Sequence, residues 1–144
     1  MEETASTPKK STISIDVAQQ EVDTWLDAKH VKPKKRLEYR DTIEDIVSAV
    51  QEGILVLNED KTFTHQLLFP LTSESGDSVA SSLTYKMRIT QADKRPHLKL
   101  VRPGDLDGKI TATIAALTGQ SFGIIEKLDI EDRDIAQSIA LFFY

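Results

Sequence analysis

Few side chains of this chain have the type and spacing that catalysis or metal binding requires. The three histidines, His30, His65 and His97, fall in different predicted elements, and none belongs to a nucleophile, metal-binding or phosphate-binding motif. The chain has no cysteine, which excludes disulfides, thiolate catalysis and thiolate metal sites. It also lacks a P-loop and a glycine-rich dinucleotide turn. We therefore expect no catalytic residue, no cofactor and no metal, in a protein that is not an enzyme.

Two acidic segments have features of metal sites. Residues 105–108 look like part of a calcium loop, but placing the loop glycine at Gly108 puts Pro103 first and Ile114 twelfth, and neither side chain offers an oxygen ligand. We predict a turn and an N-cap before a helix there instead. The acidic residues between 129 and 134 occupy the predicted first turn of another helix, where carboxylates complement the positive end of the helix dipole.

Residues 29–36 form a basic run with five Lys or Arg in eight positions. Such a run contacts phosphate, acts as a targeting patch or lies in a solvated turn between helices. Acidic residues follow directly and no aromatic residue is interleaved, which favours the solvated turn. A net charge of -5 and a pI near 5.2 also argue against nucleic acid as the main partner, because binding to its backbone needs a dense positive surface.

The length of 144 residues suits one domain, or one compact domain with a helical piece attached. Residues 1–12 are polar and predict a flexible arm. No apolar run approaches the roughly 18 residues that span a bilayer. The start of the chain lacks the basic region and apolar stretch of a secretory signal. We therefore expect a cytoplasmic protein with no membrane partner.

Residues 13–53 predict a pair of helices. The first spans about residues 16–29 with Asp16 as its N-cap, and the second spans about residues 34–52 with Gly53 as its C-cap. Apolar residues recur at helical spacing on the inner face of each helix. The predicted core residues are Ala18, Val22, Trp25 and Leu26 in the first helix, and Tyr39, Ile43, Ile46, Val47 and Val50 in the second.

Beyond Gly53 the pattern changes to that of strands. Residues 54–57 and 63–69 predict a hairpin whose second strand stops at Pro70. The serine-rich residues 72–82 predict a polar loop. Apolar and polar residues alternate from 83 to 90, which predicts a half-buried strand, and residues 97–101 predict another.

The C-terminal part predicts two helices. One begins at Asp107 or Gly108 and ends at Gly119. The other is capped by Asp129, with Asp132 three residues on in an acidic version of the capping box. The order of elements predicts an α+β fold with an N-terminal helical pair, a small antiparallel sheet and two C-terminal helices.

The sequence closes on three aromatic residues, and two interpretations of them are open. In the first interpretation, the three residues extend the apolar stripe of the last helix and pack in the core. In the second, at least one of them contacts an apolar helix of another protein. The residues that we predict to contact a partner are Ile124, Ile125, Phe142, Phe143 and Tyr144.

Several segments together resemble a known family. They are Leu83-Thr-Tyr-Lys-Met-Arg-Ile-Thr, Leu98-Lys-Leu-Val-Arg-Pro-Gly-Asp-Leu, Ile114-Ala-Ala-Leu-Thr-Gly, Leu128-Asp-Ile-Glu-Asp and Ile139-Ala-Leu-Phe-Phe. In order and spacing they resemble the short tail assembly chaperones of Mu-like, contractile-tailed bacteriophages, over residues 63–144. The helical pair at residues 13–53 is not part of that pattern.

The resemblance implies a non-enzymatic assembly factor in the cytoplasm of the host cell. Such a protein binds the phage tape measure protein, keeps it soluble and helps to recruit the tail tube protein. Residues 54–144 would form the tail-assembly-chaperone-like domain. An acidic carrier with exposed apolar helix faces fits this task physically. The alternative expectation is a structural subunit of the virion, in its neck, tail or baseplate. Both interpretations are compatible with a protein that forms a homo-oligomer.

Overall fold

The computed structural model describes residues 12–73 and 75–144, so that the predicted flexible arm at residues 1–12 lies almost wholly outside the described residues. The α+β fold is confirmed, with seven α-helices and one three-stranded antiparallel sheet in the described residues. The helices are α1 (Ile15–Ala28), α2 (Pro33–Glu38), α3 (Arg40–Gln51), α4 (Gln91–Leu98), α5 (Leu106–Thr118), α6 (Phe122–Ile125) and α7 (Ile130–Ala140), followed by a 3-10 turn, η1 (Leu141–Phe143). The strands, in their spatial order, are β1 (Leu55–Leu57), β2 (Phe63–Thr72) and β3 (Ser78–Tyr85).

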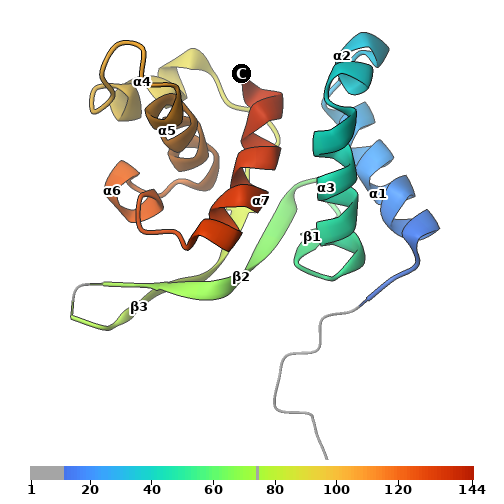
Figure 1. Cartoon of the computed structure of the whole chain (residues 1–144), viewed down its shortest axis with the longest axis horizontal. Helices are drawn as coiled ribbons and strands as arrows, with labels where there is room; N and C mark the ends of the chain where they lie inside the picture. The colour runs from blue at the N-terminus through green and yellow to red at the C-terminus, as the bar shows by residue number, and fades with distance from the viewer. Residues whose placement is uncertain (1–11, 74) are drawn as a thin grey trace, which may run out of the picture.

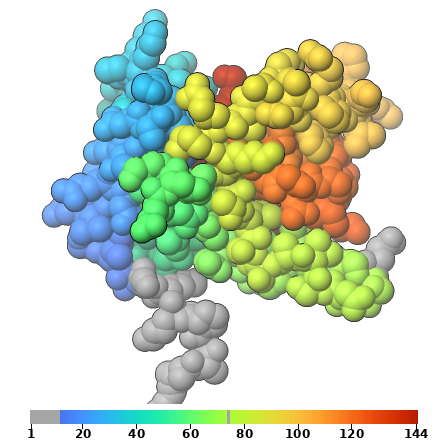
Figure 2. Space-filling view, turned by 180° about the vertical axis from the view of Figure 1, so that it is seen from behind, coloured from blue at the N-terminus to red at the C-terminus, as the bar shows by residue number. Residues whose placement is uncertain are grey.

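Helix α7 lies between the N-terminal helices and the other C-terminal helices (Figure 1). It contacts α3 on one side and α5 on the other, while α1 packs along α3 and α4 packs on α5. The sheet connects the two helical parts, because β1 contacts α3, whereas β2 contacts α7 and β3 contacts α5. Seen from behind, the β2–β3 hairpin lies along one edge of the molecule, below the C-terminal helices (Figure 2).

The N-terminal helical pair is present with two differences in detail, and its predicted end at Gly53 is confirmed. Ser14, and not Asp16, caps α1, because its side chain accepts a hydrogen bond of 3.2 Å from the backbone N–H of Val17. The predicted second helix is divided into α2 and α3, since the backbone of Tyr39 leaves the helical region with φ -103° and ψ 29°. Gly53 has a φ of 78° and ends this segment in a Schellman motif just beyond the cap residue, Glu52.

The predicted stop at Pro70 is wrong, and so is the predicted polar loop at residues 72–82. Strand β2 continues through Pro70 to Thr72, because its pairing with β3 shifts register between Gln66 and Leu71. Such an irregularity accommodates a proline, which has no N–H for the ladder. Five of the expected loop residues therefore belong to β3, and the connection between β2 and β3 is short.

Residues 86–101 also differ from the expected strands. Strand β3 ends at Tyr85, although Met87 and Ile89 still pack against the core. The predicted strand at 97–101 is wrong, because residues 91–98 form α4. Thr90 and Asp93 make a capping box at the start of this helix, which the sequence analysis did not identify.

One hydrophobic cluster of buried residues runs through both helical parts and the sheet. At its centre the ring of Trp25 lies 5.2 Å from that of Phe63 and 5.5 Å from that of Phe142, and the ring of Tyr39 lies 5.4 Å from that of Phe142. These edge-to-face and tilted contacts join α1, β2 and the turn after α7. A domain boundary after Gly53 stays a prediction, and the buried residues on its two sides belong to the same cluster.

Helix α5 is the most deeply buried helix of this fold, with buried side chains on nearly every face from Ile110 to Leu117. It ends at Gly119 as predicted, but it begins at Leu106, before the predicted start at Asp107 or Gly108. The side chain of Asp105 accepts a hydrogen bond of 3.0 Å from the N–H of Gly108, and Gly119 ends the helix in the left-handed region with a φ of 73°. The predicted N-cap turn at residues 105–108 is therefore confirmed.

We predict that Gly119→Ala lowers the free energy of unfolding by about 1 kcal/mol, because a Cβ strains the left-handed backbone. An added Cβ would meet no atom within 4 Å, so the loss comes from the backbone and not from a clash. Urea denaturation measures this loss. Gly123 has the same open space without a positive φ, so Gly123→Ala is the matched control and should not destabilise the protein. Equal losses at both glycines would contradict this explanation.

Candidate functional site

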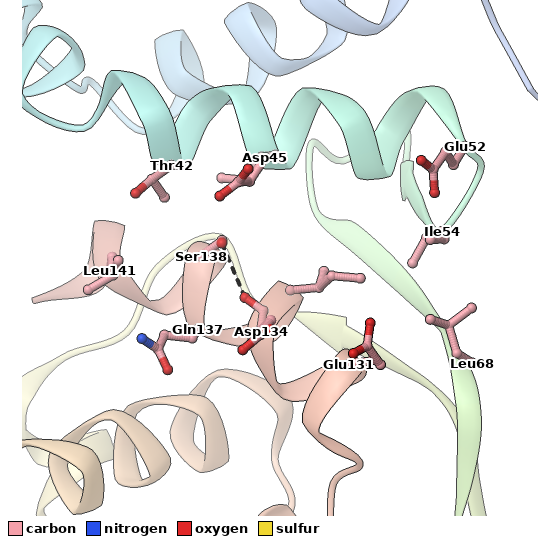
Figure 3. A pocket seen from close by; sticks show the side chains of 12 residues that line it. Thr42, Asp45, Glu52, Ile54, Leu68, Glu131, Asp134, Gln137, Ser138 and Leu141 are labelled. Atoms are coloured by element: carbon pink, nitrogen blue, oxygen red, sulfur yellow. Dashed lines mark hydrogen bonds between the residues drawn. The ribbon is translucent and has the colours of Figure 1, made fainter.

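A groove of about 550 Å³ lies between α3 and α7. Figure 3 shows α3 along one side and α7 along the other, running in opposite directions. Thr42 and Asp45 face Ser138 and Leu141 at one end, whereas Glu52 and Ile54 face Glu131 and Leu68 at the other. The twelve lining residues are Thr42, Asp45, Ile46, Glu52, Ile54, Leu68, Glu131, Asp134, Ile135, Gln137, Ser138 and Leu141.

The lining residues divide into two chemical kinds. Five are aliphatic, namely Ile46, Ile54, Leu68, Ile135 and Leu141. Four carry carboxylates that are exposed to solvent, two on the α3 side (Asp45 and Glu52) and two on α7 (Glu131 and Asp134). None of the twelve is Lys, Arg or His. Ile46 and Ile54 are buried, so the aliphatic side chains that reach solvent in the groove are those of Leu68, Ile135 and Leu141, and they lie between two acidic walls.

Beneath the surface, three polar side chains form a buried network that fixes one side of the groove. Asp132 of α7, His65 of β2 and Tyr85 of β3 are each no more than 1% exposed. The Nε2 atom of His65 lies 3.2 Å from Oδ1 of Asp132, and its Nδ1 atom lies 2.7 Å from the hydroxyl of Tyr85. The network therefore joins the last helix to both strands of the hairpin.

Asp132 also binds the backbone of β2 where the register shifts. Its Oδ1 accepts a hydrogen bond of 2.9 Å from the N–H of Leu68, and its Oδ2 accepts one of 3.0 Å from the N–H of Phe69. These two donors fall in the stretch between Gln66 and Leu71 that has no register partner on β3. The carboxylate thus replaces the missing strand partner and holds Leu68 beside α7, at the edge of the groove.

The hydrogen bonds define one consistent arrangement of protons. Neutral His65 donates from Nε2 to the Asp132 carboxylate and accepts at Nδ1 from the Tyr85 hydroxyl. Burial lowers the pKa of His65, and the neighbouring charge of Asp132 opposes this effect only in part. Burial, with the charge of Asp132 as a second cause, raises the pKa of Tyr85 well above its usual value. The phenol therefore stays protonated.

The sequence interpretation missed this network. It assigned Asp132 to the capping box of α7, but the side chain of Asp129 alone caps that helix, and Asp132 points into the core. His65 could have been found, because Phe63, His65 and Leu67 alternate on the inward face of the predicted strand. Nothing in a single sequence shows that an acidic residue of a helix's first turn pairs with that histidine.

The structure distributes the five predicted partner residues between the core and the surface. Ile125 and Phe142 are buried and are not available to a partner in this conformation. Ile124 and Phe143 are half-buried against the core, and Tyr144 is 49% exposed. Tyr144 lines a smaller hollow of about 290 Å³ with Lys94 and Lys109, away from the α3–α7 groove. Contact of Ile124, Phe143 or Tyr144 with a partner stays a prediction.

The basic run at residues 29–36 forms the C-cap of α1, the following turn and the first part of α2. The Nζ atom of Lys29 lies 3.3 Å from the centroid of the Phe143 ring, in a cation–π contact. Burial first, and then the charges of Arg88 and Lys35, lower the pKa of Lys29 to about 8. Arg36 pairs with Asp27 at 2.6 Å. At least two of the basic side chains, those of Lys29 and Arg36, thus make contacts with other residues of the chain.

In the described residues, no cluster of three or more His, Asp or Glu side chains is arranged to hold a metal ion. No helix of residues 12–73 and 75–144 is long and apolar enough to cross a membrane. No family model, curated protein or solved structure matches the chain. The groove must therefore be interpreted from its own geometry.

We predict that Asp132→Ala lowers the free energy of unfolding by about 3 kcal/mol, because it leaves buried backbone and imidazole donors without an acceptor. Chemical denaturation measures the loss. Asp134→Ala is the matched control, since Asp134 lies two residues away on the same helix and is exposed. Its free energy of unfolding should change by no more than about 0.5 kcal/mol. Similar losses for the two variants would refute the role of Asp132.

The low pKa of His65 predicts that stability falls under acid conditions. Unfolded His65 has a pKa near 6.5 and folded His65 a lower one, so unfolding takes up a proton between the two values. This contribution to stability is complete above pH 6.5 and falls by up to about 1.4 kcal/mol per pH unit below it. Urea denaturation as a function of pH should show a smaller slope for His65→Gln than for the wild type. The control variant His97→Gln should keep the wild-type slope.

Proposed function

We propose that this protein is a bacteriophage tail assembly chaperone, which binds the tape measure protein and keeps it soluble while the tail is assembled. In this role it acts in the cytoplasm of the host cell, without catalysis, and presents the tape measure protein to the tail tube protein. The proposal combines the family resemblance at residues 63–144 with the groove between α3 and α7.

The groove is the observation that carries the proposal. A long apolar helix in water associates with other apolar surfaces unless something covers it. A groove with an aliphatic surface between two helices is a common way to cover one face of such a helix. The five aliphatic residues of the α3–α7 groove come from α3, α7, β2 and the segments beside them, so that the site exists only in the folded chain.

The buried network gives further support. The most organised set of titratable side chains, His65, Tyr85 and Asp132, is closed off from solvent and presents no reacting atom to a substrate. Its hydrogen bonds hold β2 against α7 instead. Both features favour a binding protein whose rigid parts position a surface.

Co-expression with the tape measure protein of the same phage should raise the soluble yield of that protein. We expect the double variant Leu68→Gln/Leu141→Gln to lose most of this effect, because both leucines line the groove and each contributes apolar area to the bound helix. The matched control is Leu100→Gln/Leu106→Gln, which changes two leucines that are exposed and do not line the groove. Yields are measured after centrifugation of the lysates.

An unchanged soluble yield with the wild-type chain would contradict the proposed function. Mass spectrometry of purified phage particles separates it from the structural alternative. A chaperone leaves the tail and is absent from mature particles, whereas a neck, tail or baseplate subunit is present in fixed stoichiometry.

A further inference from the structure

We infer, building on the proposed function, that the helix bound in the α3–α7 groove is cationic and amphipathic, with Lys or Arg on both flanks of its apolar stripe. The charges on the two walls of the groove carry this inference. Asp45 and Glu52 stand on the α3 side, and Glu131 and Asp134 stand on the α7 side (Figure 3).

These four carboxylates have no cationic partner within the described part of the chain. The ion pairs found there join Arg36 to Asp27, His65 to Asp132 and Arg133 to Asp107. Arg133 is the one basic residue of α7, and its guanidinium points away from the groove, to Asp107 and the hydroxyl of Thr111 on α5. Among the residues that the structure describes, four like charges thus face the groove without an ion-pair partner.

A partner with neutral or acidic flanks would leave these charges unpaired or add repulsion to them. A partner with basic flanks pairs with both walls, while its apolar stripe covers the aliphatic residues between them. Electrostatic complementarity of this kind sets the choice of partner more than it adds affinity. The walls therefore select among amphipathic helices, and the aliphatic side chains between the walls add apolar contact area.

The positions of the carboxylates also predict the spacing of the partner's charges. On the α3 side, Asp45 and Glu52 are seven residues apart, or about 10 Å along a helix. On the α7 side, Glu131 and Asp134 are three residues apart, or about 4.5 Å. A helix lying parallel to these walls meets them with basic residues about seven apart on one flank and three or four apart on the other.

Synthetic peptides test the inference with the full-length protein. Three fluorescent peptides share one leucine stripe at helical spacing and carry Lys, Gln or Glu at the flanking positions just described. Titration by fluorescence anisotropy at about 0.05 M salt should show the Lys peptide binding about tenfold more tightly than the Gln peptide, and the Glu peptide most weakly. The difference should shrink at about 0.5 M salt, because salt screens exposed charges.

A charge-matched pair of variants separates the groove from the overall negative charge of the protein. Asp45→Asn/Glu131→Gln removes one carboxylate from each wall and should abolish most of the preference for the Lys peptide. Asp23→Asn/Glu59→Gln removes the same two charges from exposed positions outside the groove and should keep the preference.

Equal binding of the Lys and Gln peptides, or an equal loss in the two variants, would overturn the inference. The proposed function would survive that result if co-expression still kept the tape measure protein soluble. If co-expression has no effect while the Lys peptide binds as expected, the proposed function falls and the groove remains a site for cationic helices.

Discussion

The structure depends on the burial of one carboxylate, that of Asp132. A charge taken out of water is tolerated only when strong hydrogen bonds replace its hydration, and Asp132 accepts three such bonds from β2. These hydrogen bonds fix α7 against β2, which lies more than sixty positions earlier in the chain. The register shift of β2, which would otherwise leave Leu68 and Phe69 with unpaired N–H groups, becomes a docking point for α7.

The groove follows from that attachment. Because Asp132 points inward, its neighbours Glu131 and Asp134 on α7 point toward α3, and Leu68 is held at the edge of the same hollow. The aromatic contacts of Phe142 with Trp25 and Tyr39 fix the other end of the last helical segment to α1 and to the start of α3. Two anchors of different chemistry thus hold α7 against α3 in one orientation, which fixes the two walls of the groove relative to each other.

Local patterns predicted much of this fold, and long-range contacts account for most of the errors. The helix ends at Gly119 and Asp129 were predicted because capping depends on residues within one turn. The extent of β2 and β3 was not, because a serine-rich segment becomes a strand only when a partner strand is beside it. Pro70 was predicted to stop the strand because proline has no N–H for the ladder. The irregular pairing that accommodates it is held by Asp132, which is far away in the sequence. The groove could not be predicted at all, since its walls come from segments about ninety residues apart.

We propose that the α3–α7 groove covers a helix of the tape measure protein. Photo-crosslinking tests it most directly, with a photoreactive residue placed at Ser138 in the groove or at Leu100 outside it. Cells that co-express the tape measure protein are irradiated, and the crosslinked products are sequenced by mass spectrometry. We predict crosslinks to the tape measure protein from position 138 and none from position 100. Crosslinks of equal yield from the two positions, or none from position 138 while the two proteins still co-purify, would contradict the account.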